Sequence, residues 1–198
     1  MQKLMLITSL CCLMFACAHS PKKNYFYLTP LANIGSDDKN IGTDSEVEIN
    51  QLIGIGPVEI AEYLTRSQII DNQTDNTINM AENAYWAEPL DKSITRVIAL
   101  NLTQLNSTRS FVNFPWRNDS KPHHSVRIRV DNLSRTDNKA NINATWELLD
   151  NDAKTTNVRR NFIRAINASP GAKGLAQAYS QLLADLANEI DSELNKVR

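Results

Sequence analysis

The chain has 198 residues, a formal net charge of -1 at pH 7, 22% charged residues and 42% hydrophobic residues. This balance is typical of one globular domain, and it argues against a disordered chain and against a protein built to coat nucleic acid. All three cysteines lie within the first 17 residues. A mature chain that begins at Cys17 would therefore have no internal disulfide, no cysteine-rich zinc site and no thiol nucleophile beyond that cysteine.

Residues 1–16 have the pattern of a secretory signal. A short basic start at Lys3 precedes an almost wholly apolar run from Leu4 to Leu13. This run is too short for the roughly 20 residues that span a bilayer. No second apolar run of that length follows, so the sequence predicts cleavage rather than a transmembrane helix.

The cleavage region resembles the bacterial lipobox, which implies that Cys17 is lipidated. Ala16 supplies the small residue that this processing requires directly before the cysteine, whereas neither earlier cysteine follows one. Met14 and Phe15 depart from the pattern, which prefers Leu and then a small residue. An ordinary secretory signal with an incidental Cys17, or an apolar tail that is never cut, is the alternative.

Residues 17–23 are predicted to form the lipidated N-terminus and a short polar tether broken by Pro21. In lipoprotein sorting, Asp directly after the anchor commonly marks inner-membrane retention. This chain has Ala18 there, which by resemblance points to the outer membrane. Residues 24–198 are predicted to be a single periplasmic domain.

The first half of this domain is predicted to be mostly β. Residues 24–31 alternate as a strand, residues 32–45 read as a loop, and residues 46–60 look like a central strand that closes in a turn at Gly56-Pro57. A helical turn and a brief strand follow over residues 62–70. The segment 68–81 suggests a hairpin around a cluster of turn residues.

The second half alternates helix and sheet. Asp91 is the expected N-cap of a helix over residues 92–105, followed by a strand over 111–116. Three alternating runs, 125–133, 141–149 and 157–166, predict an antiparallel meander. Pro170 is expected at the first position of a long C-terminal helix. A mixed sheet with two substantial helices predicts an α/β sandwich.

The sequence has no recognisable catalytic motif. It lacks H-E-x-x-H, G-x-S-x-G and Walker patterns, and its scattered glutamates mark no acid/base pair. His123 and His124 are adjacent, so in an extended chain they point in opposite directions, and both are expected in solvent. We therefore expect no enzymatic activity, no metal and no cofactor.

Arginines and tryptophans supply the candidates for partner binding. Arg127 and Arg129 share a strand face, and with three arginines at 159, 160 and 164 they would form a basic strip for a protein partner or anionic head groups. The alternative is a solvated face with cross-strand ion pairs. Trp86 and Trp116 lie near prolines at loop edges, where interface roles are common, although core packing competes with that interpretation.

An ordered set of short motifs resembles the PqiC/YmbA-like lipoproteins, and the resemblance covers most of the chain after the tether. The motifs lie at Tyr27-Leu28, Gly54–Val58, Tyr63–Ile69, Trp86–Leu90 and Phe114–Trp116. Each motif is weak alone, but their order and spacing are fairly specific. Ser67 departs from the pattern, which has proline there.

The resemblance implies a three-layer α/β/α domain similar to anticodon-binding-like and TolB N-terminal folds. It implies an outer-membrane lipoprotein, facing the periplasm, that serves an ABC-type transport system and docks its MCE-domain lipid carrier, permease and ATPase at that membrane. A homo-oligomeric ring is a further implication. A stand-alone envelope module that recruits another periplasmic protein is the alternative function.

Overall fold

The computed structural model describes residues 21–31, 51–74, 76–117, 119 and 121–196. The predicted signal peptide, Cys17 and the loop over residues 32–45 lie outside these ranges, as do the first residues of the predicted strand 46–60. Among the described residues, no helix is both long and apolar enough to cross a membrane.

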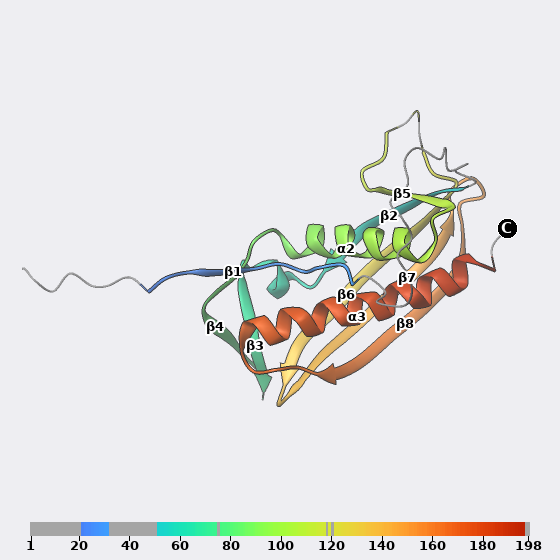
Figure 1. The fold of residues 1–198 in the computed structure, drawn as a ribbon. Coiled ribbons are helices and arrows are strands. Elements are labelled where there is room, and N and C mark those ends of the chain that lie inside the picture. Colours follow the sequence, from blue (N-terminus) through green and yellow to red (C-terminus); the bar gives the residue numbers. More distant parts are fainter. Residues whose placement is uncertain (1–20, 32–50, 75, 118, 120, 197–198) are drawn as a thin grey trace, which may run out of the picture.

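The described residues form two sheets and two long helices (Figure 1). The large sheet has the strand order β5-β2-β6-β7-β8, and the small sheet has the order β1-β4-β3. The large sheet comprises β2 (Gln51–Ile60), β5 (Arg109–Asn113), β6 (His124–Thr136), β7 (Lys139–Asp150) and β8 (Thr155–Asn167). The remaining elements are β1 (Asn24–Phe26), η1 (Glu62–Thr65), β3 (Gln68–Thr74), β4 (Thr77–Trp86), α2 (Leu90–Leu105) and α3 (Gly171–Leu194).

The predicted meander is confirmed. Strands β6, β7 and β8 pair antiparallel over almost their full lengths, while β2 pairs in parallel with both β5 and β6. Strict alternation of side chains places one set of residues in the core, because successive residues of a strand face opposite sides of the sheet. Buried members of this set include Val126, Ile128, Ala144, Trp146 and Phe162.

Both helices cover the same face of the large sheet. Helix α2 contacts β2 and β5, helix α3 contacts β7 and β8, and the two helices contact each other (Figure 1). The expected three-layer α/β/α arrangement is therefore wrong for the described residues, which place no helix on the other face. The α/β class and the mixed sheet are confirmed.

The predicted strand at residues 24–31 is shorter than expected. It ends at Phe26, and the following backbone bonds to helix side chains instead of to a strand. The backbone N–H of Thr29 donates to Ser180 Oγ at 3.1 Å, and Arg96 Nη2 donates to the carbonyl of Leu28 at 3.0 Å. These bonds hold the segment against both helices, and the side chain of Leu28 is fully buried in the core.

Three local predictions about prolines and caps need correction. Pro57 does not close β2 in a turn; the strand continues past a register shift between Ile55 and Val58. Pro89 rather than Asp91 occupies the N-cap position of α2, and Pro170 occupies that of α3 instead of the first helical turn. All three prolines occupy extended positions, inside a strand or just before a helix, which the fixed φ of proline permits.

Candidate functional site: the uncovered face of the large sheet

One face of the large sheet is covered by no helix of the described residues, and we call it the uncovered face. It carries a shallow hollow, which we call the arginine hollow. Its volume is about 220 Å³. The residues that line it belong to strands β2, β6, β7 and β8. The residues that line it are Pro57, Glu59, Arg127, Ile128, Arg129, Thr145, Glu147 and Arg159.

The strand register explains why these charges meet. In the β6–β7 pairing Arg127 lies opposite Glu147, and in the β7–β8 pairing Glu147 lies opposite Arg159. On the other side of β6, Arg129 lies opposite Glu59 of β2. Opposite charges on facing positions of adjacent strands are favourable, so the hollow combines three arginines with two glutamates.

Arg127 differs from its neighbours in this hollow. Arg159 Nε lies 3.2 Å from Glu147 Oε1, and Arg129 Nε lies 2.9 Å from Asp131 Oδ1. Arg127 is exposed and has no ion pair or side-chain hydrogen bond with another described residue. Its guanidinium group therefore offers five N–H donors in a planar fork, which suits a carboxylate of a partner.

Trp116 lies on the same uncovered face, over strand β2, which neighbours the edge strand β5. Its ring contacts Gly54, whose side of β2 faces away from the helices because Ile53 and Ile55 both enter the core. Its indole N–H donates to the carbonyl of Val112 at 3.2 Å. Its ring also meets Phe114 edge to face at 5.2 Å between centroids, and 46% of Phe114 is exposed.

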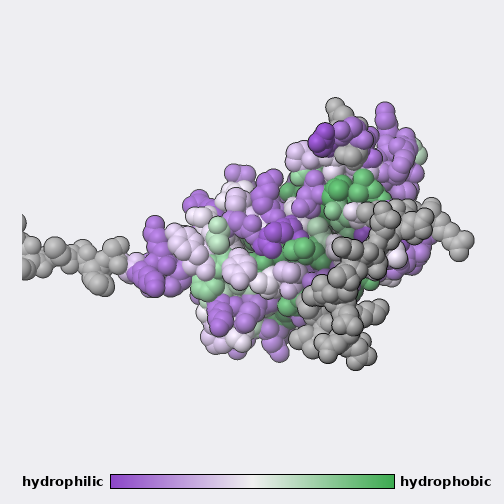
Figure 2. All heavy atoms as spheres, turned by 45° about the horizontal axis from the view of Figure 1, so that its top comes forward, coloured by the Kyte–Doolittle hydropathy of each residue, from purple (hydrophilic) through white to green (hydrophobic). Residues whose placement is uncertain are grey.

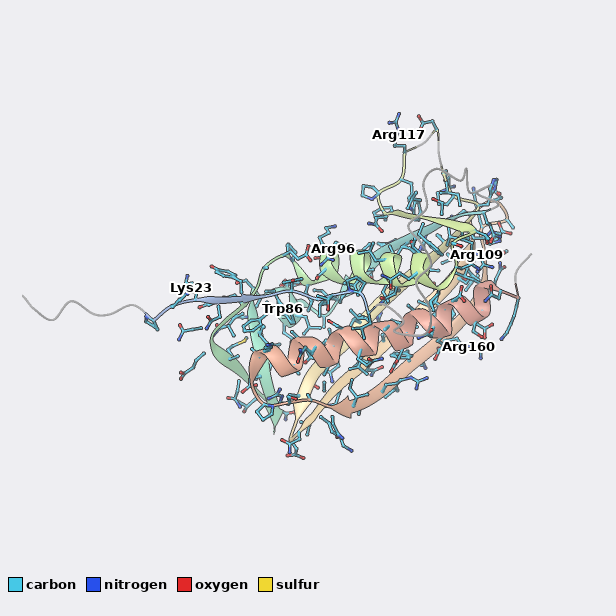
Figure 3. All side chains as sticks on the ribbon, in the orientation of Figure 1. Lys23, Trp86, Arg96, Arg109, Arg117 and Arg160 are labelled. Atoms are coloured by element: carbon cyan, nitrogen blue, oxygen red, sulfur yellow. The ribbon has the colours of Figure 1, made fainter. Side chains whose placement is uncertain are left out.

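Trp86 is a core residue and does not belong to this face. Only 7% of it is exposed, and its ring lies 6.4 Å from that of Tyr179 on α3 (Figure 3). Its backbone N–H donates to the carbonyl of Ser67. The prediction that Trp86 binds a partner is therefore wrong, because the small sheet turns the end of β4 toward the helices.

The predicted basic strip divides between the two faces of the sheet. Arg159 faces the hollow. Arg160 and Arg164 are at odd-numbered distances from Arg159 along β8, so their side chains lie on the opposite side of the sheet and face α3. Arg160 Nη2 lies 3.2 Å from Glu193 and Arg164 Nη2 lies 3.9 Å from Glu189, both on α3 (Figure 3 labels Arg160). Of the predicted partner-binding residues, the structure brings Trp116, Arg127 and Arg129 to one face.

The two histidines form no metal site. His123 is exposed and shares a hydrogen bond with Asp152, whose carboxylate raises the pKa of the imidazole. His124 is half-buried. Within the described ranges, no group of three or more His, Cys, Asp or Glu side chains is placed to hold a metal ion.

Sequence reasoning missed the two glutamates of the hollow. Glu59 and Glu147 stand far apart in the chain, and only the register of β2, β6 and β7 places them beside the arginines. The alternation of residues 125–133 and 141–149 could have indicated Glu147. It predicts which residues of that hairpin face away from the core, and Glu147 is one of them. No local pattern relates Glu59 to Arg129, because their strands are joined by a long crossover.

Comparison with known proteins places this architecture in a family. Residues 38–191 match the model of the ABC-type transport auxiliary lipoprotein component family. The chain is 26% identical over 179 residues to the intermembrane transport lipoprotein PqiC of Escherichia coli K12, covering 85% of this chain and 86% of that protein.

Solved structures show the same fold at lower identity. An uncharacterized protein superposes with a TM-score of 0.69 at 19% identity, covering 88% of this chain and 99% of the other. A protein from Xanthomonas campestris superposes with a TM-score of 0.59 at 16% identity, covering 71% and 80%. The family match spans most of the chain, and the chain belongs to the ABC-type transport auxiliary lipoprotein component family.

Proposed function

We propose that this protein is a lipid-anchored periplasmic component of an ABC-type intermembrane transport system, and that the arginine hollow is where it contacts that system. Lipidation of Cys17 would hold it at the outer membrane. Its partner would be the MCE-domain protein that carries lipid, together with that protein's permease and ATPase. The family match and the name of the Escherichia coli relative support this proposal.

The observation that carries the docking proposal is the exposed guanidinium of Arg127, which forms no ion pair with any other residue that the structure describes. Charged side chains on such faces are normally satisfied by neighbouring side chains. Here Arg159 pairs with Glu147 across the β7–β8 ladder, and Arg129 pairs with Asp131 on its own strand. The same face carries the exposed Phe114 and the partly buried Trp116. Arginine together with aromatic residues is the composition enriched in protein interfaces.

The position of this face suits a protein tethered at its N-terminus. The tether joins the domain near Lys23 at one end, and the loop that carries Arg117 projects from the opposite end (Figures 1 and 3). A domain held to the membrane by its N-terminus would direct the Trp116 loop away from the lipid. That orientation would leave the loop and the sheet face available to a periplasmic partner.

Co-purification tests this proposal. The tagged protein is extracted in detergent from its native membrane, and MCE-domain partners are identified by mass spectrometry. We expect Arg127→Glu to reduce partner recovery at least tenfold. Arg66→Glu is the matched control, because Arg66 is exposed at the end of η1 and lies outside the hollow. Absence of any MCE partner from the wild-type eluate would refute the proposal.

Two further parts of the proposal have separate tests. Cys17→Ala should abolish labelling by a fatty-acid probe and release the protein from the outer-membrane fraction; unchanged labelling would contradict the anchor.

The ring of identical subunits implied by the family resemblance predicts a single oligomer of defined mass in analytical ultracentrifugation. A monomer at every concentration would contradict the ring.

A further inference from the structure

A second exposed surface lies at the end of the domain where the tether enters. Tyr25 and Tyr27 are each 62% exposed, which is unusual for two large aromatic residues so close in the sequence. Lys22 and Lys23 precede them and are exposed. Figure 2 shows strongly hydrophilic residues beside near-neutral ones at this end of the molecule.

The tyrosines border a groove between the N-terminal segment and α3. Its volume is about 370 Å³. Lys173, in the first turn of α3, adds a positive charge to it, and none of the described residues that line the groove is acidic. Those residues are Tyr25, Phe26, Tyr27, Thr29, Lys173, Ala176, Gln177 and Ser180.

Tyr25 is held in place by contacts with strand β4. The ring of Tyr25 lies 5.9 Å from that of Tyr85 on β4, and Lys23 Nζ lies 5.4 Å from the centroid of the Tyr85 ring. Parallel pairing of β1 with β4 fixes this register, with Tyr25 opposite Tyr85. Tyr25 and Lys23 thus both pack against the ring of Tyr85, while most of the surface of Tyr25 and Tyr27 remains exposed for another contact.

This combination fits the boundary of a negatively charged lipid bilayer. Tyrosine has an apolar ring and a polar hydroxyl, so it partitions to the headgroup level of a membrane. Lysine extends an apolar stem along such a surface and keeps its ammonium group beside anionic lipid headgroups. A protein partner would equally accept the tyrosines, but it would not favour three lysines without an acidic surface of its own.

The length of the tether agrees with this contact. Tyr25 lies eight positions after Cys17 in the sequence, and a fully extended chain spans at most about 29 Å over that number of steps. A lipid attached at Cys17 would therefore keep the tyrosines within a short distance of the headgroups. This step rests on the anchor proposed above, whereas the composition of the surface does not.

We propose that Lys22, Lys23, Tyr25, Tyr27 and Lys173 form a membrane-contact surface that rests on anionic lipid headgroups. This tyrosine–lysine surface orients the domain on its membrane. It adds a second point of attachment to the lipid anchor, with the Trp116 loop directed away from the bilayer.

Vesicle co-sedimentation tests the surface without the lipid anchor. The chain from Cys17 onward carries Cys17→Ser, and it retains every buried apolar residue of the described part because these lie between Leu28 and Leu194. It is mixed with vesicles of phosphatidylcholine alone or with added phosphatidylglycerol. We expect binding only to the anionic vesicles, with a partition coefficient that falls as salt is added.

Matched charge reversals locate the contact. The triple variant Lys22→Glu, Lys23→Glu, Lys173→Glu should lose at least about a hundredfold in partition coefficient. Each lysine near an anionic surface contributes about fivefold, and each glutamate adds repulsion. The control triple Arg117→Glu, Lys121→Glu, Lys154→Glu changes the net charge equally, at exposed positions outside the surface, and should bind more tightly than the first triple. Circular dichroism confirms that each variant is folded.

Two results would overturn the proposal: equal binding of the parent chain to neutral and anionic vesicles, or equal losses in the two triple variants. Tyr25→Ser with Tyr27→Ser separates the aromatic contribution, and unchanged binding would remove the tyrosines from the surface. None of these measurements involves an acyl chain or a protein partner. Failure here therefore leaves the Cys17 anchor and the transport proposal to their own tests.

Discussion

The indole ring of Trp116 lies directly over Gly54, so closely that a β-carbon on Gly54 would be 2.4 Å from Cζ2 of the ring. The glycine thus makes room for the tryptophan on the uncovered face of the sheet. We expect Gly54→Ala to destabilise the protein by about 1–3 kcal/mol, the usual cost of overpacking a filled site. Urea unfolding measures this loss, and tryptophan fluorescence reports displacement of a ring.

A double-mutant cycle shows whether the cost arises at this contact. In a Trp116→Ala background, Gly54→Ala should cost much less, leaving only the crowding of Pro122 against the new methyl group. An equal cost in both backgrounds would mean that the alanine acts through the backbone of β2 rather than through the ring. The same variants also test whether the Trp116 loop contributes to capture of the transport partner.

Trp86 and Trp116 should behave differently when each is replaced by alanine. Trp86 is 7% exposed and packs against Tyr179, so Trp86→Ala should cost about 3–5 kcal/mol in the free energy of unfolding. Trp116 is only partly buried, and its loss should cost less while reducing partner recovery. A larger stability loss for Trp116→Ala than for Trp86→Ala would contradict the assignment of Trp86 to the core.

Arg109 joins the edge of the large sheet to the end of α3. Its Nη1 lies 3.2 Å from Asp191 Oδ1, and its Nη2 donates to the carbonyl of Leu194 at 2.9 Å. The side chains of Arg109 and Asp191 are only 11% and 16% exposed. Arg109→Met should therefore cost about 3–5 kcal/mol, because it leaves a largely buried carboxylate without its partner.

Arg129 provides the matched control for this ion pair. Its side chain is 64% exposed and its partner Asp131 is 39% exposed, so Arg129→Met should change the free energy of unfolding by no more than about 1 kcal/mol. Chemical denaturation of the two variants compares them directly. Similar losses would show that burial does not decide the strength of these pairs.

Local periodicity predicted the elements of this fold better than their arrangement. The apolar residues at helical spacing in α3 and the alternating residues of β6 and β7 predicted these elements correctly, because each element packs one side against a continuous core. The sequence does not state which face of a sheet a helix covers, and both helices of this chain cover the same one. The third layer was expected from resemblance, and no residue pattern supported or opposed it.

The candidate site was partly predictable for the same reason. Arg127 and Arg129 were assigned to one face from the alternation of a single strand, and that assignment is confirmed. Arg159 and Arg160 are consecutive residues of β8, so their side chains face opposite sides of the sheet. The sequence alone does not tell which of these two sides the helices cover. Trp86 and Trp116 look alike in sequence, but only long-range contacts with Tyr179 and Gly54 distinguish them.

His123 supplies a prediction about pH. The imidazole of His123 donates a hydrogen bond to the carboxylate of Asp152. This bond, followed by the charge of Asp152, raises the pKa of the imidazole above the ordinary value of 6.5. The folded state therefore favours the protonated ring. The pair stabilises the protein fully below the pKa of the unfolded chain, and this contribution is lost as pH rises through the higher pKa of the folded state.

Nuclear magnetic resonance titration of the His123 ring protons measures this pKa directly. Asp152→Asn removes the carboxylate charge while keeping the shape of the side chain, so it should bring the pKa of His123 back toward 6.5. The stability difference between the parent chain and this variant should be largest at acidic pH and should shrink as pH rises above that value. Because His123 is exposed, the difference should also shrink with added salt. An unshifted pKa in the parent chain, or a stability difference that grows with pH, would contradict the pairing.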